Sequence, residues 1–325
     1  MKKIVITGAN GFVGSSLVNR LKLDNYVVSG LVRKNCNTDL IKDKKCIHIV
    51  DYNNSEQLKK ILKDTDILIH AAALTRSRHW SDFQRVNIDL TEKLVDICNN
   101  LSIKHFIFIS SQAVTGPAID KNHKKKESEQ PDPVTRYGKS KLEAENIIMK
   151  KAEIPWTIVR SVSVFGPGDK DFLKLFKLVK NHFVILNGFK HKYYNLIYIE
   201  EMVNLIKKTI NNKRTFNEIF HLANPRIITN KELVKKIGRV INSKVVIIKI
   251  PELILSPIAI IFEFTSKLIK CRFPILNKEK VKDFKENYWI VDSSKSQELL
   301  NYEMSNEFEN FLSITYQWYK NMRWL

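Results

Sequence analysis

The chain has 325 residues, of which 44% are hydrophobic and 10% aromatic. That is enough to bury the core of one large α/β domain and a smaller one, and it excludes a disordered chain. The net charge is +20, but the lysines that dominate it are spread along the chain, and only Lys124-Lys125-Lys126 form a cluster. We therefore expect no nucleic-acid partner.

The cysteines and the N-terminus indicate a compartment. The four cysteines are scattered without a CxxC pair, and Met1-Lys2-Lys3 runs directly into an apolar segment, which leaves no room for a signal peptide. Both features predict a cytoplasmic protein with free thiols. The eight histidines form no HExxH group, so we expect no metal site.

The first apolar segment ends in a glycine-rich turn. The run Ile4-Val5-Ile6-Thr7 is followed by Gly8, Gly11 and Gly14, and an amphipathic pattern starts at once. This order predicts a buried strand, a tight turn and a helix whose first amides face the turn. Gly8 allows the turn, Gly11 lets a pyrophosphate approach the backbone, and Gly14 lets helix and strand pack closely. We predict a dinucleotide-binding site here.

Strands and helices alternate up to about residue 165. Further apolar runs predict strands at Tyr26–Val32, Lys45–Val50, Asp66–Ala72, His105–Ser110 and Trp156–Arg160. Helical patterns fill the gaps at Gly14–Leu23, Ser55–Lys63, Trp80–Asn100 and Pro133–Ala152. Continuous apolar strands separated by helices predict an α/β fold, with a Rossmann-type doubly wound parallel sheet covered on both faces.

The pattern is less regular after Gly166-Pro167-Gly168. We expect helices at Phe172–Asn181, Glu200–Asn211 and Thr229–Asn242, the last capped by Thr229 with Glu232 three residues on, and strands at Leu196–Ile199, Phe220–Ala223 and Val245–Ile250. The predicted division is a dinucleotide-binding domain of residues 1–166, to which 192–222 return, and a smaller, interleaved C-terminal substrate domain of 167–191 and 223–325.

The most apolar stretch is Ile250–Ile269. Pro257 and Glu263 interrupt it, and it is too short to span a bilayer. We interpret it as a helix that lines a pocket or a subunit contact. A helix on a membrane surface is the alternative, but we expect no membrane contact.

A tyrosine and a lysine four residues apart carry the predicted chemistry. Tyr137 and Lys141 lie at the start of a helix and hence on one face. The lysine ammonium, together with a positively charged nicotinamide ring, would lower the pKa of the phenol from its usual value near 10 towards neutral pH. Ser111 ends the strand before them, where its hydroxyl can bond a substrate oxygen beside Tyr137.

These motifs occur in a characteristic order. The motifs are, in order, the glycine turn, His70-Ala71-Ala72-Ala73, Asn87, Ser111-xx-Val114-x-Gly116, Tyr137-xxx-Lys141 and Arg160-xxx-Val164-Phe165-Gly166-Pro167-Gly168. Together they resemble the extended short-chain dehydrogenase/reductase superfamily. This group includes NAD-dependent epimerases/dehydratases and dihydroflavonol-reductase-like enzymes. The resemblance implies that Tyr137 is the acid/base, that Lys141 holds the nicotinamide ribose, and that Ser111 orients the reacting oxygen. It also implies that Asn87 supports the site and that Asp51 contacts the adenine. The other coenzyme contacts we predict are Thr7, Asn10, Phe12, Val13, Tyr52, Ala71, Ala72 and Ala73.

The second strand indicates which coenzyme binds. An acidic residue at its end would select NAD(H), but Val32 is followed by Arg33 and Lys34. A guanidinium suits a 2′-phosphate, so NADP(H) is favoured. If Arg33 stacks on the adenine or faces solvent, NAD(H) would serve.

The substrate is less well defined. Gln112 and Ala113 stand where similar sugar dehydratases carry an acidic pair, which disfavours dehydration. Nucleotide-sugar enzymes tend to hold the diphosphate with an arginine where this chain has Tyr194, although Lys190, His191 and Lys192 lie close by. We predict an oxidoreductase for a ketone or secondary alcohol. The alternatives are a UDP-sugar 4-epimerase with tightly bound NAD and a non-catalytic dinucleotide-binding module. Relatives often pair through helices that correspond to Trp80–Asn100 and Pro133–Ala152, so we expect a homodimer.

Overall fold

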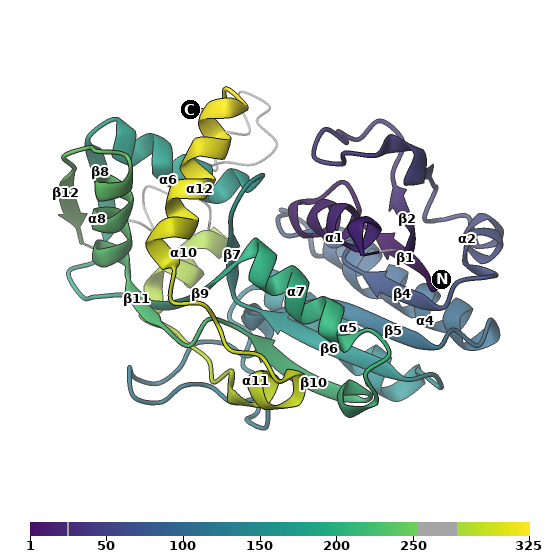
Figure 1. The fold of residues 1–325 in the computed structure, drawn as a ribbon. Coiled ribbons are helices and arrows are strands. Elements are labelled where there is room, and N and C mark those ends of the chain that lie inside the picture. Colours follow the sequence, from purple (N-terminus) through teal and green to yellow (C-terminus); the bar gives the residue numbers. More distant parts are fainter. Residues whose placement is uncertain (25, 252–277) are drawn as a thin grey trace.

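A parallel sheet forms the centre of the protein. The computed structural model describes residues 1–24, 26–251 and 278–325 (Figure 1). Seven parallel strands lie in the spatial order β10 (Glu218–Leu222), β6 (Trp156–Ser161), β5 (His105–Ser111), β4 (Ile67–His70), β1 (Lys3–Thr7), β2 (Val27–Val32) and β3 (Ile47–Ile49). The strand order reverses between β1 and β4, and ligands of doubly wound sheets bind at such a point. The predicted fold class is confirmed.

Helices cover both faces of this sheet. One face carries α1 (Phe12–Leu23) and α7 (Ile199–Thr209), which pack on each other. The other carries α2 (Ser55–Leu62), α4 (Leu90–Asn100) and α5 (Arg136–Lys151), with α4 beside α5 (Figure 1). The inner strands are buried on both sides, which explains their continuous apolar sequences, whereas the edge strand β3 is partly exposed.

The smaller part of the molecule lies beside the carboxyl ends of the strands. It holds a four-stranded sheet of β7 (Ser163–Phe165), β9 (Tyr193–Tyr198), β11 (Ile227–Thr229) and β13 (Tyr288–Trp289). A separate parallel pair is formed by β8 (Phe183–Asn187) and β12 (Val246–Ile250). The helices of the smaller part are α6 (Lys170–Lys180), α8 (Asn230–Val240), α10 (Lys278–Lys285) and α12 (Phe308–Asn321), while α11 (Ser294–Leu300) packs against β10 of the large sheet.

Several element boundaries differ from the expectation. The predicted helix Trp80–Asn100 consists of α3 (Trp80–Phe83), a wider π-helical turn η2 (Gln84–Asp89) and α4. Helix α5 begins at Arg136 rather than Pro133, because Thr135 caps it by accepting a hydrogen bond from the Gly138 amide at 3.1 Å. Strand β9 starts at Tyr193, earlier than predicted. The cap of α8 is as expected, since Thr229 accepts from the Glu232 amide at 3.1 Å.

The apolar stretch Ile250–Ile269 lies almost wholly outside the described residues. Its interpretation as a helix that lines a pocket or a subunit contact therefore stays a prediction. In the part of the chain that is described, no helix is both long enough and apolar enough to cross a bilayer.

Candidate active site

The glycine turn forms a tight backbone cradle between β1 and α1. Gly8 has a φ of +65°, and a Cβ there would lie 2.6 Å from the Cα of Ala72. A Cβ on Gly14 would lie 2.2 Å from the carbonyl oxygen of Gly8. Helix α1 starts after Gly11 without a side-chain cap, so its first amides are left to a ligand. This cradle fits a pyrophosphate, because only glycine permits such close approach and the helix N-terminus favours an anion.

The other predicted coenzyme contacts from β1, β4 and the loop after β3 gather around this turn. Tyr52 accepts a hydrogen bond from the Gly8 amide and donates one to the Leu31 carbonyl, both at 3.2 Å. Thr7 Oγ1 accepts from the Ala72 amide at 3.2 Å, which joins the loop of Ala71, Ala72 and Ala73 to the end of β1. Asn10, Phe12 and Val13 are half-buried along the turn and the first turn of α1.

Arg33 and Lys34 are exposed immediately after β2. Burial raises the pKa of the Tyr52 phenol to about 12, while the Gly8 hydrogen bond and the charge of Arg33 oppose that rise. Arg33 therefore lies within electrostatic reach of the glycine turn. Asp51 is also exposed, and its Oδ1 accepts from the Asn53 amide at 2.9 Å.

Ser111 and Tyr137 meet at the carboxyl edge of the sheet. Ser111 is the last residue of β5, and Tyr137 lies in the first turn of α5. Burial raises the pKa of Tyr137 to about 12, and hydrogen bonding with Ser111, which favours the phenolate, opposes this rise.

Lys141 lies one turn further along α5 and is 1% exposed. Its Nζ donates to the Ile109 carbonyl at 2.7 Å and lies 3.6 Å from the centre of the Phe108 ring. Burial lowers the pKa of Lys141 to about 7, against the opposing charge of Glu145. The protein groups alone thus do not produce the predicted acidification of Tyr137. Burial disfavours both charged forms, and Tyr137 stays protonated at neutral pH.

Two polar networks hold this helix in place. Asn87, in the π-helical turn η2, donates to Ser140 Oγ at 2.9 Å, and Ser140 donates to the Tyr137 carbonyl at 2.8 Å. Asn87 also exchanges hydrogen bonds with the Leu74 backbone at 2.7 and 3.0 Å. Asn87 thus reaches Tyr137 through Ser140 and fixes the loop after β4.

The second network lies beneath Lys141. Glu145 is fully buried and pairs with Arg160 of β6 at 2.7 Å, and Ser110 also donates to it. The sequence analysis missed Ser140 and Glu145 as supporting residues. Their spacing of three and eight from Tyr137 on one helix could have indicated them.

A cavity of about 100 Å³ opens next to Tyr137. The loop after β4, the start of α5 and helix α10 line it, with Thr75, Arg76, Ser77, Phe83, Ala113, Thr135, Tyr137, Glu279, Lys280 and Asp283. Glu279 accepts from the Arg136 amide at 2.7 Å and so ties α10 to α5. Burial raises the pKa of Asp283 to about 6. The sequence analysis did not predict any of the α10 residues.

The sequence analysis considered Lys192 and Tyr194 in relation to a substrate diphosphate. Lys192 is buried, and its Nζ donates to the backbone carbonyls of Phe284 and Glu286 at the end of α10. It therefore has a structural role, although the sequence suggested it as a substitute for an arginine. Burial raises the pKa of Tyr194 to about 12, and the nearby Asp283 adds to this rise.

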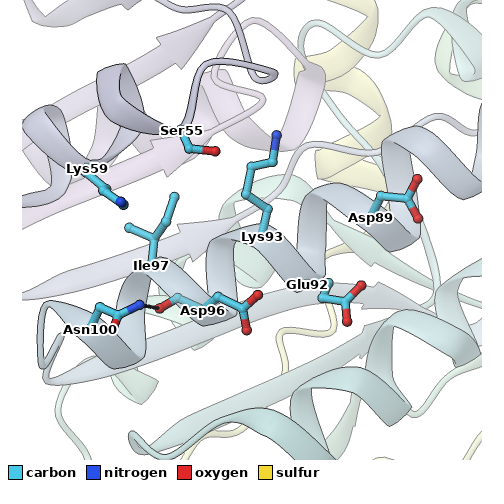
Figure 2. A pocket seen from close by; sticks show the side chains of 8 residues that line it. All are labelled: Ser55, Lys59, Asp89, Glu92, Lys93, Asp96, Ile97 and Asn100. Atoms are coloured by element: carbon cyan, nitrogen blue, oxygen red, sulfur yellow. Dashed lines mark hydrogen bonds between the residues drawn. The ribbon is translucent and has the colours of Figure 1, made fainter.

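A second hollow, of about 430 Å³, lies between α2 and α4. Figure 2 shows charged side chains around it, among them Lys59, Lys93 and Asp96. None of the predicted site residues lines it. Within residues 1–24, 26–251 and 278–325, no group of three or more histidine, cysteine or carboxylate side chains could hold a metal ion.

The doubly wound sheet, the glycine cradle and the Ser111–Tyr137 pair define a Rossmann-type enzyme site. Residues 4–223 match the model of the NAD-dependent epimerase/dehydratase family. The chain belongs to this family, and it is an enzyme of the extended short-chain dehydrogenase/reductase type, as the sequence predicted.

The relatives include both epimerases and dehydrogenases. The chain is 30% identical over 251 residues to a UDP-glucose 4-epimerase of Vibrio cholerae, which covers 73% of this chain and 75% of that protein. It is 27% identical over 236 residues to a sterol-4-alpha-carboxylate 3-dehydrogenase of Dictyostelium discoideum, covering 69% and 71%. A UDP-glucuronic acid 4-epimerase from Bacillus cereus, solved in complex with NAD, shares the fold with a TM-score of 0.78, 22% identity and coverage of 98% and 99%.

Proposed function

We propose that this protein is an NAD(P)-dependent oxidoreductase that interconverts a carbonyl and a secondary alcohol at the Ser111–Tyr137–Lys141 site. The observation that carries the proposal is the convergence of Ser111, the last residue of β5, and Tyr137, in the first turn of α5, beside a cavity that Tyr137 lines, with Lys141 one helical turn away. A hydroxyl and a phenol directed at one point are the groups needed to hold a substrate oxygen and to move its proton.

Each residue has a role in this proposal. Ser111 holds the substrate oxygen, and Tyr137 gives or takes its proton. Because burial keeps Tyr137 protonated at neutral pH, it is ready to donate to a carbonyl oxygen. Lys141 would bind the coenzyme ribose, and Asn87 would position Tyr137 through Ser140. The coenzyme, when bound, accepts or supplies the hydride.

The same proposal assigns the coenzyme site. The cradle of Gly8, Gly11 and Gly14 would hold the pyrophosphate, and Asp51 would contact the adenine. Arg33 and Lys34 favour NADP(H), because both are exposed at the end of β2, where a 2′-phosphate would need a cation. Neither forms an ion pair with any residue described in the structure. NAD(H) remains the alternative.

A UDP-sugar 4-epimerase is the second candidate. The Vibrio cholerae relative, at 30% identity, favours it. An epimerase would use the same three side chains but return the hydride to the same substrate carbon. Three features disfavour it. Tyr194 stands where an arginine would hold the diphosphate, and Lys192 instead donates hydrogen bonds to carbonyls at the end of α10. The Asp283 carboxylate, which lies near Tyr194, would also repel a diphosphate.

The two candidates differ in how they use coenzyme. An oxidoreductase should bind and release NADPH and lose its absorbance at 340 nm when a suitable ketone is added. An epimerase should purify with NAD bound and show no net coenzyme turnover while converting a UDP-sugar. Mass spectrometry of the purified protein, followed by both assays, decides between them. A protein that binds neither coenzyme would contradict both candidates.

We further propose the domain division at residues 1–166 with 192–222, against 167–191 with 223–325. Helix α7 on one face of the large sheet and β10 at its edge support the return of the chain, whereas β7 and β9 pair with each other in the smaller sheet. A cytoplasmic homodimer that pairs through α4 and α5 completes the proposal, since these helices lie side by side on one face.

A further inference from the structure

The strand pair β8–β12 presents an unusual surface at the edge of the smaller part of the molecule (Figure 1). One face of the pair packs inward through Val184 and Leu186. The other face points outward although it is apolar. Ile185 is 53% exposed and Val246 is 59% exposed, and Phe183 and Ile248 beside them are also exposed.

The register makes this face continuous. Val246 pairs with Phe183, and Ile248 pairs with Ile185, so four large apolar side chains form two adjacent cross-strand pairs. Phe189, which follows β8, is also exposed, and its carbonyl accepts a hydrogen bond from Lys249 Nζ at 2.9 Å. The outer face of a sheet in water normally carries polar residues, so such a patch indicates an interaction surface.

The sequence segments that carry this face are basic, although Lys174 and Lys236 pair with carboxylates and Lys192 is buried. The sequence segments 172–199 and 233–251, which contain β8 and β12, hold ten lysine or arginine residues and no aspartate or glutamate. Lys180 and Lys244 precede the two strands, and Lys190 follows Phe189. None of these three pairs with a carboxylate among the residues that the structure describes.

We propose that the outer face of β8–β12 binds the surface of an anionic lipid bilayer. Aromatic and aliphatic side chains surrounded by lysines match the boundary between acyl chains and phosphate headgroups. A second copy of this chain fits less well, because facing copies would bring two lysine-rich rims together. Composition alone predicted no membrane contact, since it cannot show where these side chains gather. The proposal is independent of which reaction the enzyme catalyses.

The test is sedimentation of the full-length protein with vesicles. We expect binding to vesicles of equal parts phosphatidylcholine and phosphatidylglycerol, little binding to phosphatidylcholine alone, and release at high salt. The triple variant Ile185→Thr, Ile248→Thr, Phe189→Ser should lower the bound fraction about tenfold. These side chains are exposed and threonine suits strands, so coenzyme binding should be unchanged and report an intact fold.

The control is the variant Ile49→Thr, Ile119→Thr. Both isoleucines are exposed, but Ile49 lies in β3 and Ile119 follows β5, outside the two basic segments. The control should bind vesicles like the unaltered protein. The proposal is overturned if the unaltered protein does not bind anionic vesicles. It is also overturned if the triple variant binds them as well as the unaltered protein does. It is equally overturned if the triple variant changes only self-association, measured by light scattering, because a second copy then covers the face.

Discussion

The coenzyme end and the substrate end of the site are built differently. The proposed coenzyme end is mostly backbone, a turn of three glycines from one continuous strand–turn–helix segment. The proposed substrate end consists of side chains from four separate parts of the chain: the loop after β4 with α3, the turn after β5, the start of α5 and helix α10. A backbone cradle suits a ligand common to a whole family, whereas side chains from distant segments can change with the substrate. Five substitutions test this contrast.

Tyr137→Phe addresses the point where the two ends meet. Removing the phenol hydroxyl should lower kcat about 10³-fold, because the proton donor is lost. Coenzyme affinity, measured by fluorescence titration, should be nearly unchanged, since the glycine cradle is intact. The matched control Tyr26→Phe, at a half-buried tyrosine before β2, should retain activity. Full activity of Tyr137→Phe would remove Tyr137 from the mechanism.

Gly14→Ala and Gly11→Ala probe the cradle itself. A Cβ on Gly14 would lie 2.2 Å from the Gly8 carbonyl oxygen, so the turn must shift, and we expect about 100-fold weaker coenzyme binding with a lower Tm. A Cβ on Gly11 would lie 3.2 Å from the same oxygen, which the fold can tolerate. Gly11→Ala should therefore weaken coenzyme binding while Tm stays close to that of the unaltered protein. Normal coenzyme binding in both variants would contradict the assignment.

Arg33→Ala tests the outer end of the cradle. Losing the guanidinium should weaken NADPH binding about tenfold and leave NADH binding nearly unchanged, because only NADPH carries the 2′-phosphate. Calorimetry with both coenzymes measures the ratio, and Lys42→Ala, another exposed cation, is the control. If the variant bound NADPH and NADH equally more weakly, the argument for NADP(H) would be wrong.

Asp283→Asn tests the substrate end and should have the smallest effect. Burial raises the pKa of this carboxyl to about 6, so it is charged above that pH and neutral below it. For an uncharged hydroxyl substrate, KM should rise a few-fold as the pH falls through 6, because the carboxylate is a better hydrogen-bond acceptor than the acid. A diphosphate substrate should show the reverse, since protonation removes a repulsion. Asp283→Asn should flatten the profile in either case, and an unchanged profile would exclude Asp283 from the substrate site.

The two ends also differ in how far the sequence predicts them. The parallel sheet, the glycine turn and the proximity of Ser111 to Tyr137 follow from local patterns, because carboxyl ends of parallel strands share one edge. Helix α10 could not be placed in the cavity, since its contact with Arg136 joins segments 143 residues apart. The charge states of Tyr137 and Lys141 were also unpredictable from spacing. They depend on burial, which raises one pKa and lowers the other.

A crystal structure of the protein with oxidised coenzyme tests the central claim most directly. The account predicts the pyrophosphate against Gly8, Gly11 and Gly14, the nicotinamide ribose within hydrogen-bonding distance of Lys141 Nζ, and the nicotinamide ring beside Ser111 and Tyr137. A coenzyme bound elsewhere, or one whose nicotinamide lies away from Tyr137, would contradict it.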